Sequence, residues 1–103
     1  MPAYVVVDVE VTDSQEYAQY RAQAPPVIAK YGGRYIVRGG AVEHMEPGWD
    51  FHRFVMLEFP SVAAAKKWYN SPEYQKLLPV RKRTTRSRLA IVEGLDPGAP
   101  VPP

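Results

Sequence analysis

The sequence contains no cysteine among its 103 residues, which excludes disulfide bonds, thiolate metal sites and a cysteine nucleophile. The absence of disulfides is typical of a reducing compartment, and we expect a cytoplasmic protein. No apolar run is long enough to span a lipid bilayer, and the first residues lack the basic and apolar regions of a signal peptide. Membrane insertion and export are therefore not expected.

A large excess of one charge is also missing. Lysine and arginine number 13 and acidic residues 11, so the formal net charge is +2, which by itself is no indication of nucleic-acid binding. Basic residues gather between Lys76 and Arg88 without an acid among them, a pattern more typical of a solvated helix face. No glycine-rich phosphate loop, dinucleotide fingerprint or G-x-S-x-G elbow is present, so the sequence indicates no cofactor.

Four segments have the composition of β-strands, since they are rich in β-branched and aromatic residues. We expect strands over residues 3–11, 34–45, 53–59 and 89–93. The first is a near-continuous run of valines, which favours burial on both of its faces. Gly39-Gly40 interrupts the second strand and predicts a bulge or bend.

Helical periodicity fills the intervals between these strands. The first helix is expected over residues 13–31, with a kink or restart at Pro25-Pro26, because proline lacks the backbone N–H of a helix interior. A second helical region begins at residue 62, restarts at Ser71-Pro72 and is expected to break at Pro79. The side chains predicted to cap the helix starts are those of Asp13, Ser61 and Ser71.

The resulting order β-α-β-β-α-β is that of a ferredoxin-like α+β fold, a four-stranded antiparallel sheet with its helices on one face. In the strands 3–11, 53–59 and 89–93, apolar residues occur at both odd and even positions, so that both faces of each strand carry them. A sheet face in contact with water would not require this. We therefore expect a homodimer through the sheet face opposite the helices, a dimeric α+β barrel formed by residues 1–94. The proline-rich residues 95–103 are expected to be a flexible tail.

Several blocks occur in the order Tyr35–Gly40, Arg53–Ser61, Trp68–Tyr74 and Ile91–Gly94. Together they resemble the DUF1330 family, small bacterial proteins of the dimeric α+β barrel superfamily. The resemblance implies a ferredoxin-like protomer whose sheet packs on that of a partner. It implies no activity, because relatives on this fold include cofactor-independent monooxygenases, muconolactone isomerase-like enzymes, haem-handling proteins and stress-response proteins.

His52 is the candidate catalytic residue. A histidine imidazole exchanges protons near neutral pH, and the adjacent Arg53 has a guanidinium suited to an anionic substrate. The alternative, which is the more common role of a lone histidine, is that His52 only closes a loop. His44 and the nearby acidic residues have no recognised ligand spacing, so we predict no metal site.

Cationic and aromatic side chains supply the candidate ligand-binding residues, which are Arg38, Trp49, Arg53, Trp68, Tyr69 and Tyr74. Trp68 has the spacing of a core residue, and a surface salt bridge would equally explain Arg38. Trp49 lies in a predicted turn, where so large a ring is expected to cover a pocket, a core edge or the partner chain. We expect one cleft between sheet and helices that prefers a small anionic or aromatic molecule, bordered by Arg38, His52, Arg53, Trp68 and Tyr69.

Three classes of function stay open at this point. The first is a small-molecule binding protein or cofactor-independent enzyme. The second is a non-catalytic dimeric assembly or stress-response module, which needs only the sheet face. The third is an RNA-binding domain, which shares the element order, but residues 52–59 lack the glycine-aromatic pattern of an RRM strand.

Overall fold

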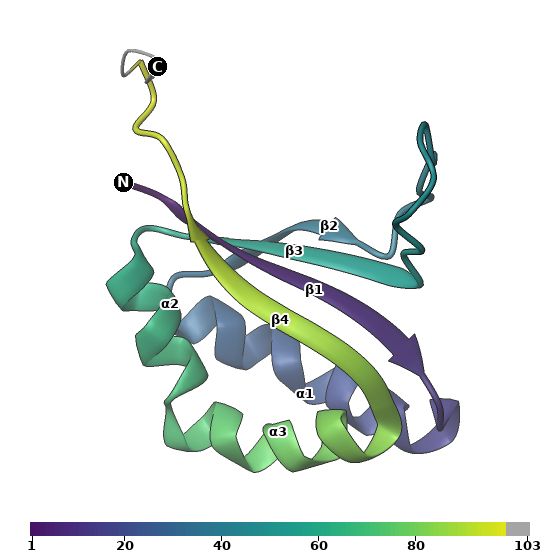
Figure 1. The fold of residues 1–103 in the computed structure, drawn as a ribbon. Coiled ribbons are helices and arrows are strands. Elements are labelled where there is room, and N and C mark those ends of the chain that lie inside the picture. The colour runs from purple at the N-terminus through teal and green to yellow at the C-terminus, as the bar shows by residue number, and fades with distance from the viewer. Residues whose placement is uncertain (99–103) are drawn as a thin grey trace.

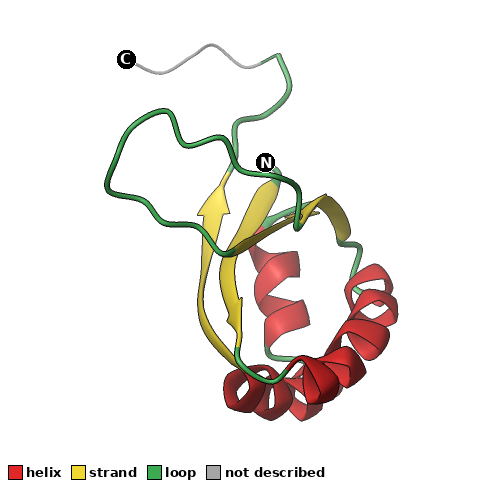
Figure 2. Cartoon of the chain, turned by 90° about the vertical axis from the view of Figure 1, so that its right-hand side faces the viewer, coloured by secondary structure: helices red, strands yellow, loops and turns green. Residues whose placement is uncertain are grey.

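The computed structural model describes residues 1–98, which form one antiparallel sheet with helices on one face (Figures 1 and 2). The strands are β1 (Ala3–Val11), β2 (Arg34–Arg38), β3 (Arg53–Phe59) and β4 (Thr85–Glu93). The helices are α1 (Ser14–Lys30), α2 (Val62–Tyr69) and α3 (Pro72–Thr84). The strand order β2-β3-β1-β4 places β1 inside the sheet. The predicted α+β, ferredoxin-like arrangement is confirmed.

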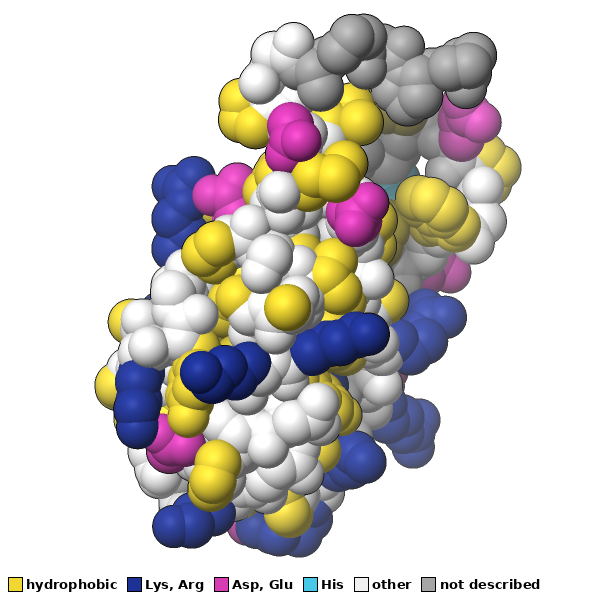
Figure 3. All heavy atoms as spheres, turned by 90° about the vertical axis from the view of Figure 1, so that its left-hand side faces the viewer, with side chains coloured by type: hydrophobic (Ala, Val, Ile, Leu, Met, Phe, Trp, Pro, Cys, Tyr) yellow, Lys and Arg dark blue, Asp and Glu magenta, His cyan; other side chains and the backbone are white. Residues whose placement is uncertain are grey.

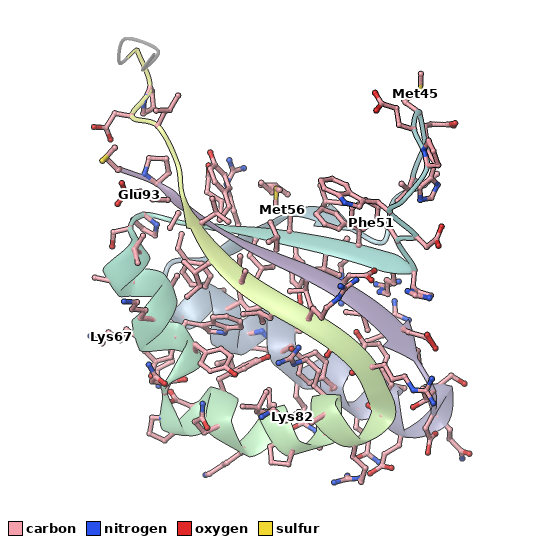
Figure 4. All side chains as sticks on the ribbon, viewed as in Figure 1. Met45, Phe51, Met56, Lys67, Lys82 and Glu93 are labelled. Atoms are coloured by element: carbon pink, nitrogen blue, oxygen red, sulfur yellow. The ribbon has the colours of Figure 1, made fainter. Side chains whose placement is uncertain are left out.

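Burial alternates along β1. Ala3, Val5, Val7 and Val9 are buried beneath the helices, whereas the residues between them are half-buried on the other face, here called the outer face. Met56 of β3 lies on this outer face, on the side of the sheet away from the helices (Figure 4). Within the chain, the valine-rich strand therefore packs a core on one side only, and the expected burial of both faces is not observed.

The three predicted helix caps are present. Asp13 accepts a hydrogen bond from the backbone N–H of Glu16 at 3.1 Å, and the hydroxyls of Ser61 and Ser71 accept from residues 64 and 74 at 3.0 and 3.1 Å. Of the predicted kink or restart at Pro25-Pro26, the restart is not observed, because α1 runs through both prolines. Burial of Ala24 and Ile28 on either side of them holds this helix on the sheet.

The predicted break at Pro79 is also not observed, since α3 is continuous from Pro72 to Thr84. Leu77 and Leu78 precede this proline and are buried, while Pro79 itself is exposed. Packing of the apolar face thus compensates for the hydrogen bond that the proline ring removes.

Two strand boundaries differ from the prediction. The second strand ends at Arg38 instead of residue 45, because Gly39 turns into the left-handed region at φ +71° and residues 39–52 form a loop. The last strand begins at Thr85 instead of residue 89. Its polar first half pairs with β1 from Val11 to Asp8, so the basic run is divided between α3 and β4.

The two ends of the described chain lie side by side (Figure 1). The N–H of Gly94 donates to the carbonyl of Pro2 at 2.8 Å, and the N-terminal amino group lies 3.1 Å from the carboxylate of Asp96. The last part of the predicted flexible tail, residues 99–103, lies outside the described residues. Across residues 1–98, none of the helices has the length and apolar character needed to cross a membrane.

Candidate functional site

A cavity of about 40 Å³ lies between the sheet and the helices. Valines and leucines of β1, β3 and β4 form its apolar wall, and Trp68 of α2 closes one part of it. Its polar lining is dominated by four arginines, which are Arg21, Arg38, Arg53 and Arg81. A buried water needs roughly 10–15 Å³ of such space, so the cavity is large enough for about three waters or a compact ligand.

A β-bulge in β2 directs Arg38 into this cavity. Tyr35 pairs with Leu57, but the next pair along the ladder is Val37 with Met56, so one extra residue is inserted into β2. Arg38 is thereby opposite Val55, a residue of the helix-facing side of the sheet. Without the bulge, the two-residue alternation of a strand would place Arg38 on the outer face.

The α1 prolines give Arg38 a second contact. Because Pro25 has no N–H, the carbonyl of Arg21 lacks its usual helical partner four residues later. One Nη of Arg38 donates to this carbonyl in a long hydrogen bond of 3.4 Å. The guanidinium of Arg38 also lies 4.5 Å from the ring centroid of Tyr35, a cation–π contact. These contacts fix Arg38 at the edge of the cavity.

Arg53 enters the cavity from β3, on the same face as Val55 and Leu57. Its guanidinium lies against Gly39, where an added Cβ would come within 2.6 Å of an Arg53 Nη. Gly39 is thus required by its positive φ and by the close approach of Arg53. The Nε of Arg53 is buried and has no hydrogen-bond partner.

Arg81 comes from α3 and is 5% exposed. It follows Tyr74, Leu77 and Leu78 at the spacing of the helix face that packs on the sheet. One Nη donates to the hydroxyl of Ser87 at 2.9 Å, but the Nε is buried without a partner. A guanidinium buried to this degree is normally paired with an acid.

The arginines fall into two groups of four. Those outside the cavity each lie within 4.0 Å of a carboxylate, and they are Arg34, Arg83, Arg86 and Arg88. Within residues 1–98, none of the cavity arginines has such a partner, and no Asp, Glu or His lines the cavity. The cavity therefore concentrates positive charge that the described residues do not neutralise.

The unpartnered hydrogen-bond donors converge on the same place. Across the described part of the chain, three buried side-chain nitrogen or oxygen atoms lack a partner, namely Arg53 Nε, Trp68 Nε1 and Arg81 Nε. All three belong to residues that line the cavity, and all three are donors. Since buried polar groups are normally hydrogen-bonded, these three donors would favour a hydrogen-bond acceptor bound at the cavity.

Tyrosine hydroxyls add neutral donors. Tyr20 lines the cavity, and its hydroxyl lies 2.8 Å from that of Tyr74. Burial, and next the neighbouring Tyr74, raise the pKa of Tyr20 far above its usual value. Burial also raises the pKa of Tyr35, against the opposing charge of Arg38. Both phenols therefore stay protonated near neutral pH, so the lining can attract an anion and donate hydrogen bonds to it but contains no general base.

The structure brings Arg38, Arg53 and Trp68 together at the cavity. Tyr74 is fully buried with its ring centroid 4.3 Å from that of Trp68, and the Tyr69 centroid lies 6.1 Å from the Trp68 centroid. These two tyrosines support the lining without reaching the cavity. Three of the six expected ligand-binding residues thus share one site.

His52 and Trp49 lie elsewhere. Because Arg53 points toward the helices, strand alternation turns His52 to the outer face, where its ring lies 3.4 Å from Asp8 and 3.3 Å from Glu10. Trp49 is 74% exposed in the loop 39–52 and contacts Phe51 edge-on. The expected single cleft bordered by His52 and Trp68 is therefore not formed. Within the described residues, no group of three His, Asp or Glu side chains is placed to hold a metal ion.

Two cavity arginines, Arg21 and Arg81, were not expected from the sequence. Arg81 had a detectable signal, since it occupies the position seven residues after Tyr74 on an otherwise apolar helix face. Arg21 lies four residues after Tyr17, another lining residue of the same helix. These two spacings point to a site only when the cavity is already known, because isolated arginines are common on helix surfaces.

The fold and this cavity define a ferredoxin-like α+β protein with a cavity between sheet and helices that four arginines line. The chain belongs to the DUF1330 family, described as a domain of unknown function, whose sequence model matches residues 2–95. No curated protein matches the chain.

Solved structures share this fold. RPA0582 of Rhodopseudomonas palustris, a protein of unknown function, has 24% identity and a TM-score of 0.75, covering 93% of this chain and 84% of its own. A dimeric ferredoxin-like protein of unknown function from Jannaschia sp. CCS1 has 14% identity and a TM-score of 0.67, covering 91% and 100%. SnoaB, a cofactor-independent oxygenase from Streptomyces nogalater, has 10% identity and a TM-score of 0.64, covering 92% and 94%.

Proposed function

We propose that this protein binds a small anionic molecule in the cavity between sheet and helices. The observation that carries the proposal is the convergence of Arg21, Arg38, Arg53 and Arg81 without a carboxylate partner in the described residues. An aromatic ligand is disfavoured, because a cavity that holds a benzene ring measures on the order of 150 Å³, against about 40 Å³ here.

The test is stabilisation by ligand. Short carboxylic acids and inorganic oxyanions should raise the thermal midpoint of the wild type, because a ligand that binds only the folded state stabilises it by mass action. Arg53→Ala should lose this response. Arg34→Ala is the matched control, since it removes the same charge from a surface ion pair with Glu58. An equal response of Arg53→Ala, or none in the wild type, would contradict the proposal.

A cofactor-independent reaction in the same cavity is a second proposal. Tyr20 favours it, because a buried phenol that stays protonated can donate a hydrogen bond to negative charge that develops on a bound substrate. The SnoaB relative is a cofactor-independent oxygenase, which illustrates that this fold accommodates chemistry without a cofactor. The lack of a base in the lining favours binding over catalysis, so we rank the reaction below ligand binding.

We also propose a homodimer through the outer face. This face carries partly exposed apolar side chains, including Val92 at 50%, and solved relatives are described as dimeric. The loop 39–52 and residues 94–98 both rise on this side of the sheet (Figures 1 and 2), and Phe51 of the loop packs on Phe54 of the outer face with ring centroids 5.3 Å apart. Light scattering should give about twice the chain mass of 11.6 kDa, and a monomer at micromolar concentration would contradict the dimer.

Nucleic-acid binding is the least supported function. On the face drawn in Figure 3, lysine and arginine side chains are separated by acidic, apolar and other groups and form no continuous basic stripe. A site that binds along the phosphate backbone of RNA would need such a stripe. The cavity arginines do not supply one, because Arg53 and Arg81 are turned inward.

A further inference from the structure

We propose that the ligand is a compact oxyanion carrying two negative charges, held between Arg53 of β3 and Arg81 of α3 with Trp68 of α2 as a third donor. This inference rests on the proposed function of the cavity and names the chemical class of its ligand. It also assigns ligand contact to Arg81, a residue that no sequence motif marks.

The first argument is the balance of buried charge. Arg81 is 5% exposed, so its guanidinium is largely removed from water, whereas Arg53 is partly buried, with its Nε inaccessible to solvent. A buried charge is costly unless a counter-charge lies close to it. A ligand with two negative charges therefore balances this pair of cations better than a ligand with one. Arg21 and Arg38 are exposed, so water and salt screen them and they need no further neutralisation.

The second argument is the number of donors. A carboxylate has two oxygens, and an arginine fork typically engages both of them side by side. Arg53 and Arg81 approach from the sheet layer and from the helix layer, and Trp68 Nε1 adds a donor from a third element. A ligand that accepts hydrogen bonds from all of these donors at the same time needs three or more acceptor oxygens. A tetrahedral oxyanion or two directly joined carboxylates meets this requirement, and a single carboxylate does not.

The third argument is size. The volume of about 40 Å³ corresponds to about three waters, so the charged part of the ligand must be compact. Sulfate, hydrogen phosphate and oxalate are small dianions of this kind. A longer dicarboxylate such as glutarate would have to leave its second charge outside the donors.

The experiment measures anion preference by titration calorimetry at pH 8 and matched ionic strength. Sulfate, oxalate and phosphate should bind at least about tenfold more tightly than formate, acetate and nitrate, as expected for one additional charge-assisted contact. The preference should disappear in Arg81→Met and Arg53→Met. Lys82→Met, which removes an exposed charge from the same helix as Arg81, should keep it.

Two outcomes separate this inference from the proposed function. Equal affinity for dianions and monoanions would overturn the dianion assignment while leaving anion binding intact. Failure of every anion to bind would overturn both. If Arg81→Met does not fold, Arg81→Lys keeps the positive charge but loses the Nε and the planar fork, and it should lower the dianion affinity more than the monoanion affinity. An unchanged preference in Arg81→Lys would exclude the proposed contact.

Discussion

Replacing Arg81 by methionine should stabilise the folded protein in the absence of anions. The guanidinium of Arg81 is 5% exposed, has an unpartnered Nε and faces no acid in the described residues. Methionine has a similar length and a flexible apolar side chain that can fill the same space. The substitution therefore removes a buried, uncompensated charge while it keeps most of the packing against α3 and β4.

The magnitude follows from two opposing contributions. The variant loses the hydrogen bond from Arg81 to Ser87, a loss of about 1 kcal/mol, although the hydroxyl of Ser87 still accepts from Thr85 at 3.1 Å. The variant also no longer contains the unsatisfied buried Nε donor, whose removal raises the unfolding free energy by about 1–3 kcal/mol, nor the charge that folding removes from water. We expect a net gain of about 1 kcal/mol, which raises the thermal midpoint of a domain this small by roughly 4–8 °C.

The assay is urea unfolding followed by tryptophan fluorescence, at fixed protein concentration in a buffer without oxyanions. Lys82→Met is the control for the change in net charge and should alter the unfolding free energy by less than about 0.5 kcal/mol. A loss of more than about 1 kcal/mol in Arg81→Met would refute the reasoning, because Arg81 would then be a structural cation of the fold.

Three further predictions concern other parts of the molecule. Tyr20→Phe removes the partner of the buried Tyr74 hydroxyl and should lower the unfolding free energy by about 1–3 kcal/mol, whereas Tyr4→Phe on the outer face should not. Burial raises the pKa of Asp8, but hydrogen bonds from His52 outweigh it and hold the pKa below its usual value. The ionised Asp8 therefore stabilises the fold above about pH 4, and the difference in unfolding free energy between wild type and Asp8→Asn should shrink as the pH falls through the lowered pKa of Asp8 in the folded state. Deleting residues 95–103 removes one surface ion pair and should leave the thermal midpoint within about 2 °C; a larger fall would mean that this segment contributes to packing.

The fold could be predicted from the sequence because its signals are local. Valines of β1 and the side chains that cap the helices act on their own neighbours, so their effect does not depend on the tertiary structure. The errors occurred where tertiary contacts override local preference. Pro25-Pro26 and Pro79 remain inside helices because buried neighbours hold these helices on the sheet, and the polar start of β4 is a strand because β1 pairs with it.

The site could be predicted only in part. Arg53 follows from strand alternation, but the same alternation turns its neighbour His52 to the outer face. Arg38 reaches the cavity through a one-residue bulge at Ile36, whereas the sequence predicted a bulge or bend at Gly39-Gly40, where the strand has already ended. Arg81 becomes meaningful only when its lack of an acidic partner is visible, and that is a property of the folded chain.

The most direct test of an anion-binding cavity is the NMR signal of the arginine Nε–H groups during a sulfate titration. Signals assigned with Arg53→Met and Arg81→Met variants should shift and saturate in the wild type, because these two Nε atoms have no partner among the described residues. Arg34, whose Nε already donates to Glu58 at 2.8 Å, is the internal control and should shift little. Saturable shifts at Arg53 and Arg81 are the predicted result, and unchanged signals at both with shifts confined to surface arginines such as Arg34 would contradict the account.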